Sequence, residues 1–245
     1  MHLLPSIFAA LPHALCAVRG VTSHFQHVDN RRSDPGRIQR LARSATKSHT
    51  TNNTALLSLK SEGSIMAATA VAVPKLVVFD CDMCLWEPEM FELRQPPTRL
   101  EAATNSVVAG NDRVKLFEGA KLALFELSTQ EKFSDTQVAV ASATTQKEWA
   151  LACLRLFQVS PGVTADDVVK YREIYPDNKV RHFKSLQTAS GIAYKDMLFF
   201  DDCNWGDNCR DVEWGCPGVV TIKTPNGLTA EKWAEGLAKF AGTKR

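Results

Sequence analysis

The feature that most constrains this chain is a short apolar run, residues 76–79, that ends abruptly in Asp80. Its length and its β-branched residues are typical of a buried strand. The run at 197–200 ends in the same way, at Asp201 and Asp202. Buried strands of this kind belong to parallel sheets, where ligands bind beyond the carboxyl ends of the strands.

Strand-like and helix-like segments alternate from Lys75 onward. This alternation predicts an α/β fold, a Rossmann-like doubly wound parallel sheet. Gly191 provides a stop signal for one of the helices. The predicted strands are 76–79, 136–142, 168–171, 197–200 and 219–223, and the predicted helices are 117–128, 145–157, 179–189 and 229–241, with a further helical stretch between the last two strands.

The spacing between the polar strand ends leaves no room for a large cap domain. A loop, one helix and one strand fill most of the segment between Trp86 and Ser142, and a helix, a strand and a turn fill the segment up to Lys179. Residues 87–115 contain prolines and polar side chains, so we expect a surface loop able to act as a flap. The site at the strand ends is therefore expected to be open.

Basic residues are distributed unevenly along the chain. Residues 1–72 hold eight Lys or Arg against three acids, whereas the remainder holds 21 against 24. The leader suits an organelle transit peptide, and the alternatives are a disordered extension or read-through upstream of a true start at Met66. We expect a leader over 1–72 and one folded domain over 73–245, located in the cytoplasm or, with a transit peptide, in a mitochondrion or plastid. No nucleic-acid partner is expected.

Seven cysteines at irregular spacing are unlike the framework of a small secreted scaffold, so reduced thiols in an intracellular protein are expected. No apolar run approaches the roughly 20 residues that span a bilayer, which predicts a soluble protein without membrane insertion. Cys81 and Cys84 form a C-x-x-C motif with Asp82 inside it. Structural thiols are the favoured interpretation, and a redox pair or a zinc site are the alternatives.

Two carboxylates, Asp80 and Asp82, lie two positions apart after the first predicted strand. In an extended chain both face one side, so one can attack a substrate while the other transfers protons. Converging carboxylates repel each other, and a divalent cation is the usual remedy. Asp201 and Asp202 supply further oxygen ligands, and an all-oxygen site favours Mg²⁺ over Zn²⁺.

A hydroxyl and an ammonium group complete the pattern. Ser142 ends the second predicted strand, and Lys179 begins a predicted helix. Together they supply the hydrogen-bond donor and the positive charge that a phosphoryl group needs on the side away from a metal ion. The order acidic pair, hydroxyl, lysine, acidic pair therefore predicts a magnesium-dependent phosphoryl-transfer site.

This arrangement resembles the haloacid dehalogenase (HAD) superfamily, and the residues around it resemble the superfamily's magnesium-dependent phosphatase branch. The resemblance covers residues 74–240. REIYP followed by K-V-x-H-F is the match most specific to the branch. The matching segments are PKLVVFDCDMCLW (74–86), VAVAS (138–142), REIYPDNKVRHF (172–183) and MLFFDDCN (197–204).

The resemblance implies roles for individual residues. Asp80 would be the nucleophile and a metal ligand, and Asp82 the general acid and base, with its backbone carbonyl as a further ligand. Asp202 would be the principal metal ligand of the last motif, with Asp201 ligating directly or through water. The implied substrate-binding residues are Cys81, Ser142, Ala143 and Lys179.

Three positions depart from the pattern of the branch. Cys84 stands where Thr is usual, Ala143 stands where the branch tends to carry Arg, and Trp205-Gly206 resembles part of a short insertion. Loss of that Arg removes a bidentate anion clamp, which weakens substrate binding more than metal-assisted chemistry. We therefore expect activity to be retained and the preferred substrate to differ from that of relatives.

Other residues with reactive or aromatic side chains receive structural interpretations. His182 lies three positions after Lys179 in a predicted helix, so packing is favoured over a catalytic base. The tryptophans are expected in the core or on helix faces. For Trp86 and Trp205, a place at the edge of the site is the alternative.

The residues and the resemblance together predict a magnesium-dependent phosphomonoester hydrolase that forms an aspartyl-phosphate on Asp80. Its expected partner is a phosphorylated small molecule or phosphoprotein, with phosphotyrosine or a sugar phosphate as substrate and protein-tyrosine-phosphatase activity included. The alternative is a non-catalytic module with a HAD-like or receiver-like fold. A receiver places its phosphorylated Asp on a later strand than its acidic pair, so the motif order disfavours that alternative.

Overall fold

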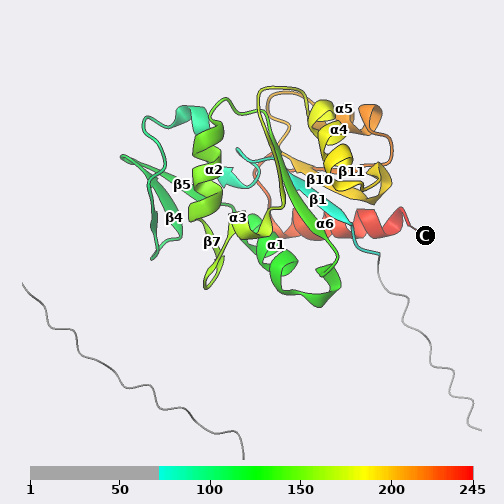
Figure 1. Ribbon diagram of the computed structural model, residues 1–245, viewed down its shortest axis with the longest axis horizontal. Coiled ribbons are helices and arrows are strands. Elements are labelled where there is room, and N and C mark those ends of the chain that lie inside the picture. The colour runs from blue at the N-terminus through cyan, green and yellow to red at the C-terminus, as the bar shows by residue number, and fades with distance from the viewer. Residues whose placement is uncertain (1–71, 245) are drawn as a thin grey trace, which may run out of the picture. The chain divides into compact units, whose positions relative to one another are not determined.

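The computed structural model describes residues 72–244 (Figure 1). The leader expected over residues 1–72, with its transit-peptide and start-site alternatives, lies outside the described residues except for its last position. Within 72–244, no helix is long and apolar enough to cross a bilayer.

The centre of the folded domain is a five-stranded parallel sheet in the order β11-β10-β1-β6-β9. Strand β1 is central and buried along its whole length. This sheet, with helices on both faces, confirms the predicted doubly wound α/β fold. Its strands are β1 (Leu76–Phe79), β6 (Gln137–Ser142), β9 (Tyr171–Ile174), β10 (Met197–Asp201) and β11 (Val220–Lys223).

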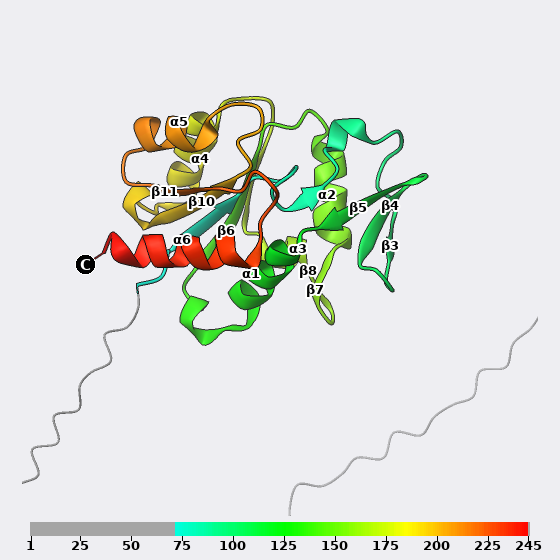
Figure 2. The same ribbon diagram turned by 180° about the vertical axis from the view of Figure 1, so that it is seen from behind.

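Helices lie on both faces of the parallel sheet, as Figure 2 shows for α1 and α6 on one side and for α4 and α5 on the other. The helices of the described chain are α1 (Glu118–Thr129), α2 (Lys147–Leu156), α3 (Ala165–Val168), α4 (Lys179–Ser190), α5 (Asn208–Gly215) and α6 (Ala230–Gly242). Short 3-10 helices are η1 (Met90–Glu92), η2 (Glu131–Phe133) and η3 (Tyr194–Asp196).

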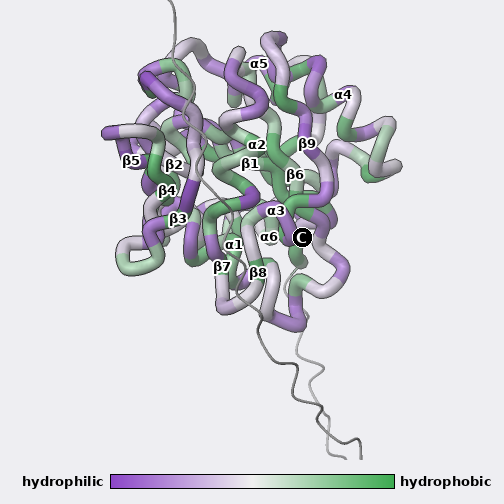
Figure 3. Tube along the Cα trace, turned by 60° about the vertical axis from the view of Figure 1, so that its left-hand side comes forward, coloured by the Kyte–Doolittle hydropathy of each residue, from purple (hydrophilic) through white to green (hydrophobic). Residues whose placement is uncertain are grey.

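Alternate residues of β1 pack into two cores, one on each face of the sheet. Val77 and Phe79 belong to the larger core, which includes residues of α1 and α6. Leu76 and Val78 belong to the smaller core, which includes residues of α4 and α5. Figure 3 shows the hydrophobic stretches of β1 and β6 in the interior, with hydrophilic residues on outer turns. Burial of apolar side chains on both faces therefore fixes the position of the central strand.

Parallel pairing brings the ends of β1, β6 and β10 to one edge of the sheet. Phe79 pairs with Phe200 of β10 and with Val140 of β6. Asp80 therefore leaves β1 level with Asp201 at the end of β10. This is the edge at which doubly wound sheets bind ligands.

Helix α4 begins and ends where the sequence predicts. Asn178 Oδ1 accepts a hydrogen bond from Arg181 N at 2.9 Å and caps the first turn. Gly191 ends the helix in the left-handed region, with φ of +71°. Because the cap precedes Lys179, it places this lysine at the first position of the helix, at the same edge of the sheet.

The strand predicted near 168–171 is present but begins three residues later, because residues 165–168 form α3 and β9 covers Tyr171–Ile174. A capping box stabilises this helical turn. Thr164 Oγ1 accepts from Asp167 N at 3.3 Å, and Asp167 Oδ2 accepts from Thr164 N at 2.8 Å. The structure also contains an unpredicted hairpin of β7 (Gln158–Ser160) and β8 (Val163–Thr164).

The prediction of a surface loop over 87–115 is wrong, because residues 87, 99–101, 106–109 and 112–115 belong to a four-stranded antiparallel sheet in the order β2-β5-β4-β3. A two-residue turn, Gly110-Asn111, joins β4 to β5, and Gly110 has φ of +60°. Val107 and Val114 pair across this hairpin and are fully buried in the larger core. The strands are β2 (Trp86–Glu87), β3 (Arg99–Glu101), β4 (Ser106–Ala109) and β5 (Asp112–Leu116).

Candidate active site

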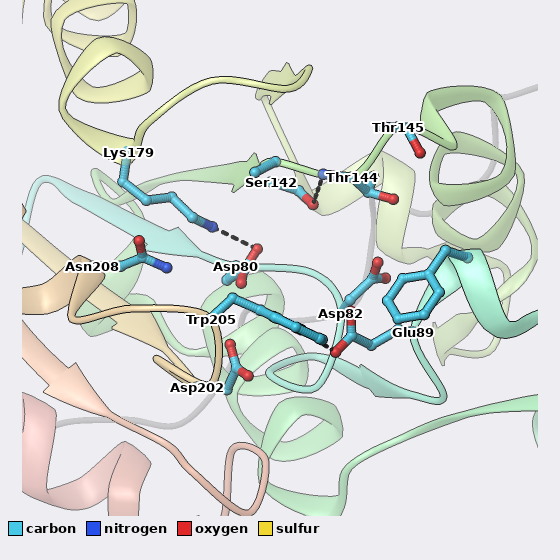
Figure 4. A pocket seen from close by; sticks show the side chains of 12 residues that line it. Asp80, Asp82, Glu89, Ser142, Thr144, Thr145, Lys179, Asp202, Trp205 and Asn208 are labelled. Atoms are coloured by element: carbon cyan, nitrogen blue, oxygen red, sulfur yellow. Dashed lines mark hydrogen bonds and ion pairs between the residues drawn. The ribbon is translucent and has the colours of Figure 1, made fainter.

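A cavity of about 380 Å³ lies at the carboxyl edge of the parallel sheet (Figure 4). Asp80 follows β1, Ser142 ends β6 and Lys179 begins α4, so separate elements bring these side chains together. All predicted site residues except Cys81 and Asp201 line the cavity. The lining residues are Asp80, Asp82, Glu89, Phe91, Ser142, Ala143, Thr144, Thr145, Lys179, Asp202, Trp205 and Asn208.

Three buried residues, Asp80, Asp201 and Asp202, form an aspartate cluster with carboxylate oxygens within 4.8 Å of one another. Asp201 Oδ1 accepts hydrogen bonds from Cys203 N at 2.8 Å and from Asn208 Nδ2 at 3.0 Å. Asp201 Oδ2 is buried without an aligned hydrogen-bond donor. Three carboxylates that converge in this way fit a divalent cation that prefers oxygen ligands.

Lys179 supplies positive charge beside the aspartate cluster. Its Nζ lies 2.7 Å from Asp80 Oδ1 and forms an ion pair with Asp201 Oδ2 at 3.1 Å. Nζ also donates to Ala141 O at 2.7 Å. Burial alone lowers the pKa of Lys179, but Asp80 and Asp201 outweigh burial and raise the pKa above its ordinary value. The side chain is therefore a permanent ammonium group at physiological pH.

Burial and neighbouring carboxylates destabilise the charged forms of Asp80 and Asp202. Burial raises the pKa of Asp80 well above its ordinary value, although Lys179 opposes this shift and Asp201 adds to it. Burial also raises the pKa of Asp202 to about 6, with a contribution from Asp201. Carboxylates in this situation favour any ligand that brings positive charge.

Asp82 lies two residues from Asp80 but has a different environment. Trp86 Nε1 donates to Asp82 Oδ1 at 2.8 Å, and Met90 N donates to Asp82 Oδ2 at 3.1 Å. Burial raises the pKa of Asp82 to about 6, against the lowering effect of both hydrogen bonds. A carboxyl group with this pKa exchanges protons close to neutral pH. Its side chain is outside the aspartate cluster, and metal binding by its backbone carbonyl stays a prediction.

The other predicted substrate-binding residues surround Asp80. Cys81 N donates to Asp80 Oδ1 at 2.7 Å, whereas the Cys81 side chain is buried in the larger core. Ser142 and Ala143 line the cavity, and Thr144 N donates to Ser142 Oγ at 3.3 Å. Cys81 can therefore contact a bound phosphate only through its backbone, while the Ser142 hydroxyl is available to it.

Several lining residues are absent from the sequence prediction. Thr144 and Thr145 follow the end of β6, and Asn208 begins α5 shortly after the last acidic pair. Their closeness to predicted motifs is the signal that identifies them. Glu89 and Phe91 lie in the segment interpreted as a loop, where no periodic pattern distinguishes them.

Trp86 and Trp205 have opposite environments. Trp86 is fully buried and holds Asp82, as described above. Trp205 is 77% exposed, lines the cavity and donates from Nε1 to Glu89 Oε1 at 2.6 Å (Figure 4). The core interpretation therefore holds for Trp86, and the alternative at the edge of the site holds for Trp205.

The cysteines and His182 have packing environments. All cysteines of residues 72–244 are free, and all but Cys203 are buried. Cys84 Sγ donates to Phe200 O at 3.5 Å. Within the same residues, the His, Cys, Asp and Glu side chains arranged to hold a metal are those of the aspartate cluster alone, which disfavours a zinc site at the cysteines. His182 is fully buried, with Nε2 3.0 Å from Tyr175 O, as its predicted packing role requires.

A doubly wound parallel sheet whose strand ends bring Asp80, Asp202, Ser142 and Lys179 to one cavity defines a HAD-like hydrolase. Comparison with protein families agrees with this class. The chain belongs to the acid phosphatase family, whose model matches residues 72–243. This range agrees with the resemblance predicted over 74–240.

The chain is also similar to individual proteins. The chain is 32% identical to human magnesium-dependent phosphatase 1 over 174 residues, which cover 69% of this chain and 88% of that protein. It is 28% identical over 137 residues to a HAD-like hydrolase superfamily protein of Schizosaccharomyces pombe, covering 54% of this chain and 77% of that one. The phosphatase-domain structure of a Bacteroides fragilis protein, complexed with Mg, aligns with a TM-score of 0.48 and 17% identity, over 69% of this chain and 40% of that one. The match to the acid phosphatase family and the likeness to magnesium-dependent phosphatase 1 confirm the predicted superfamily and branch.

Proposed function

We propose that this chain is a magnesium-dependent phosphomonoesterase that forms an aspartyl-phosphate on Asp80. The observation that carries the proposal is the 2.7 Å contact of Lys179 Nζ with Asp80 Oδ1, beside the aspartate cluster. The Asp80 carboxylate therefore contacts a fixed ammonium group and also belongs to a set of oxygen ligands suited to a metal ion. A phosphoryl group seated at Asp80 would meet both positive charges that phosphoryl transfer needs.

The donor set supports magnesium as the metal. Asp80, Asp201 and Asp202 would hold the ion through carboxylate oxygens, with the Asp82 carbonyl as a further ligand, and oxygen-only sites suit Mg²⁺. When bound, Mg²⁺ neutralises these carboxylates and withdraws charge from the phosphoryl oxygens. A relative named as a magnesium-dependent phosphatase supports this assignment.

The proposed reaction has two proton-coupled steps. First, an Asp80 oxygen attacks phosphorus, the bond from phosphorus to the leaving oxygen breaks, and Asp82 gives a proton to that oxygen. Second, Asp82 takes a proton from a water molecule as the water attacks phosphorus, which breaks the aspartyl-phosphate bond and releases inorganic phosphate. The hydrogen bonds from Trp86 and Met90 support this role because they fix the Asp82 carboxyl group in place.

Phosphotyrosine or a sugar phosphate is the proposed substrate type, with protein-tyrosine-phosphatase activity as one expression of it. Among the lining residues of the described chain, Lys179 is the only cation, and Ala143 offers no anion clamp. A site with one cation beside its metal suits a simple monoester better than a substrate with a second phosphate. Two exposed lining residues, Phe91 and Trp205, support access for a larger substrate.

The test is phosphate release from p-nitrophenyl phosphate and from a panel of phosphometabolites and phosphopeptides, with Mg²⁺ or with EDTA. Turnover in Mg²⁺ that is lost in EDTA supports the proposal. A protein that becomes phosphorylated without releasing phosphate would identify the receiver-like alternative. Failure to become phosphorylated at all would identify a scaffold.

A further inference from the structure

We propose that Phe91 and Trp205, whose Nε1 donates to Glu89, form a binding site for an aromatic ring in the leaving group of the substrate. This inference rests on the proposed phosphomonoesterase function and assigns a part of the same cavity that the phosphoryl chemistry does not use. We call Phe91 and Trp205 the aromatic pair. The chemical class of the ligand is a phosphate monoester of a phenol.

The aromatic pair is exposed and lines the same cavity as the residues proposed for the phosphoryl chemistry. Phe91 is 57% exposed and Trp205 is 77% exposed, and both line the cavity that also contains Asp80 and Lys179. Exposure of large apolar side chains to water is unfavourable, and a cavity lined by them gains free energy when a ring covers them. The residues proposed to bind the phosphoryl group are polar and buried. Phe91 and Trp205 supply exposed apolar surface in the same cavity.

The aromatic pair is held in place before any ligand binds. The two rings pack edge to face, with centroids 6.3 Å apart and planes at 71°. Trp205 Nε1 also donates to Glu89 Oε1 at 2.6 Å, which joins the segment after β2 to the segment after β10. A ring that binds to this preformed surface does not have to order it, which reduces the entropy cost of binding.

The charge at this part of the cavity selects against anionic leaving groups. The Glu89 carboxylate lines the cavity beside the aromatic pair. The cationic lining residue Lys179 is already paired with Asp80 and Asp201. A phenyl ring is neutral and meets no repulsion from Glu89, whereas a second phosphate or a carboxylate in the leaving group does.

Trp214 provides a matched control within the same chain. It is 73% exposed, almost as much as Trp205, but it lies on α5 away from the cavity lining. The Arg210 guanidinium covers its ring at 5.1 Å. Replacing Trp214 therefore removes an exposed tryptophan without removing the surface that the proposal invokes.

The kinetic test compares phenyl phosphate, a phosphotyrosyl peptide and glycerol 2-phosphate in full-length protein with Mg²⁺. Ring stacking contributes roughly 0.5–1.5 kcal/mol, so Trp205→Ala should raise KM about twofold to twelvefold for both phenolic substrates. For these substrates kcat should change by less than about twofold, because the effect is on binding. Trp205→Phe should recover part of the loss, because it keeps an aromatic ring but not the hydrogen bond to Glu89, and KM for glycerol 2-phosphate should hardly change.

The result with the control decides between a specific and a general effect. Trp214→Ala should leave all three substrates unchanged. Equal changes in KM for phenolic and alkyl substrates, or an effect on the peptide but not on phenyl phosphate, would overturn ring recognition. A change with Trp214→Ala equal to that with Trp205→Ala would overturn it as well.

A binding measurement separates this inference from the proposed function. Calorimetry with phenylphosphonate and methylphosphonate in Mg²⁺ needs no turnover. Tighter binding of phenylphosphonate that is lost in Trp205→Ala supports the ring site even if the wild type hydrolyses nothing, in which case only the proposed function fails. Equal affinities for the two phosphonates in an active wild-type enzyme would overturn the ring site alone.

Discussion

The floor of the cavity and its mouth are built from different parts of the fold. The floor, Asp80, Asp202 and Lys179, comes from the ends of parallel strands and the start of α4, and its side chains are buried. The mouth, Phe91 and Trp205, comes from segments outside the parallel sheet, and its rings are mostly exposed. Strand register therefore positions the residues of the proposed chemistry, whereas the residues proposed to contact the leaving group are side chains that the core does not constrain.

The largest expected effect is at the floor. Asp80→Asn removes the attacking oxygen and weakens metal binding, so kcat/KM should fall by at least about 10⁴-fold. No phosphoenzyme should form in acid-trapping experiments with a labelled substrate. Asp211→Asn is the control, because it removes an exposed carboxylate of α5 and should leave activity unchanged. Residual turnover in Asp80→Asn close to that of the control would show that Asp80 is not the nucleophile.

Asp82→Asn should be less damaging, and its effect should depend on the leaving group. General acid–base catalysis contributes about 10²–10⁴-fold, and alkyl phosphates should lose roughly this factor. The first step with p-nitrophenyl phosphate should be affected less, because p-nitrophenolate leaves without a proton. Water attack then becomes limiting, so quenched-flow should detect a burst of phosphoenzyme. Equal losses on aryl and alkyl substrates without a burst would contradict the role of Asp82.

Lys179→Met tests how the floor is stabilised. Removal of a buried cation leaves the carboxylates of Asp80 and Asp201 uncompensated, so the free energy of unfolding in EDTA should fall by about 3–5 kcal/mol. Mg²⁺ should restore part of this loss. Urea denaturation of both forms gives the measurement. Lys223→Met is the control, since its exposed ion pair with Asp207 should contribute at most about 1 kcal/mol.

The free energy of unfolding is expected to depend on the protonation of His182, a buried residue of α4, the helix that begins at Lys179. Burial, with a smaller contribution from Lys179, lowers its pKa from an ordinary value of 6.5 to about 4. Between these values the unfolded chain binds more protons than the folded one, so the free energy of unfolding decreases as pH falls from about 6.5 to 4. Wild type should lose about 2–3 kcal/mol more than His182→Asn over this range, measured by denaturation in Mg²⁺. Parallel pH profiles for the two proteins would exclude this effect.

The smallest expected effect is on stability at the mouth. Trp205→Ala should change the free energy of unfolding by no more than about 0.5 kcal/mol, because the ring is mostly exposed. A large loss of stability in urea denaturation would mean that the mouth is part of the core, and the distinction between floor and mouth would no longer hold.

The same distinction explains what the sequence could predict. Asp80 and Ser142 are recognisable because each stands where a strand pattern ends, and parallel register brings such ends together. Lys179 is recognisable because it stands where a helical pattern begins. The cap residue Asn178 and the stop residue Gly191 likewise act through local hydrogen bonds and backbone geometry that sequence encodes. These elements are predictable because local and tertiary preferences agree.

The errors have two physical origins. The helical turn at Ala165–Val168 depends on reciprocal hydrogen bonds between Thr164 and Asp167, and the neighbouring valines conceal this signal. The small antiparallel sheet has a recognisable turn at Gly110-Asn111, but its short strands pair with segments that lack clear alternation. Glu89 and Phe91 could not be assigned to the site because their places depend on that sheet.

The two hydrogen bonds to Asp201 Oδ1 have a structural consequence. The two donors, Cys203 N and Asn208 Nδ2, lie at the two ends of the segment 203–208, which contains Trp205. The Asp201 carboxylate therefore accepts a hydrogen bond from each end of this segment. Insertions or deletions within residues 204–207 should alter the part of the segment between these donors, while Asp201 keeps its position. In this chain, the residues between the two donors, Trp205 among them, can therefore be replaced as a unit. A foreign segment grafted between the same two donors should change the selectivity and leave Asp201 in place.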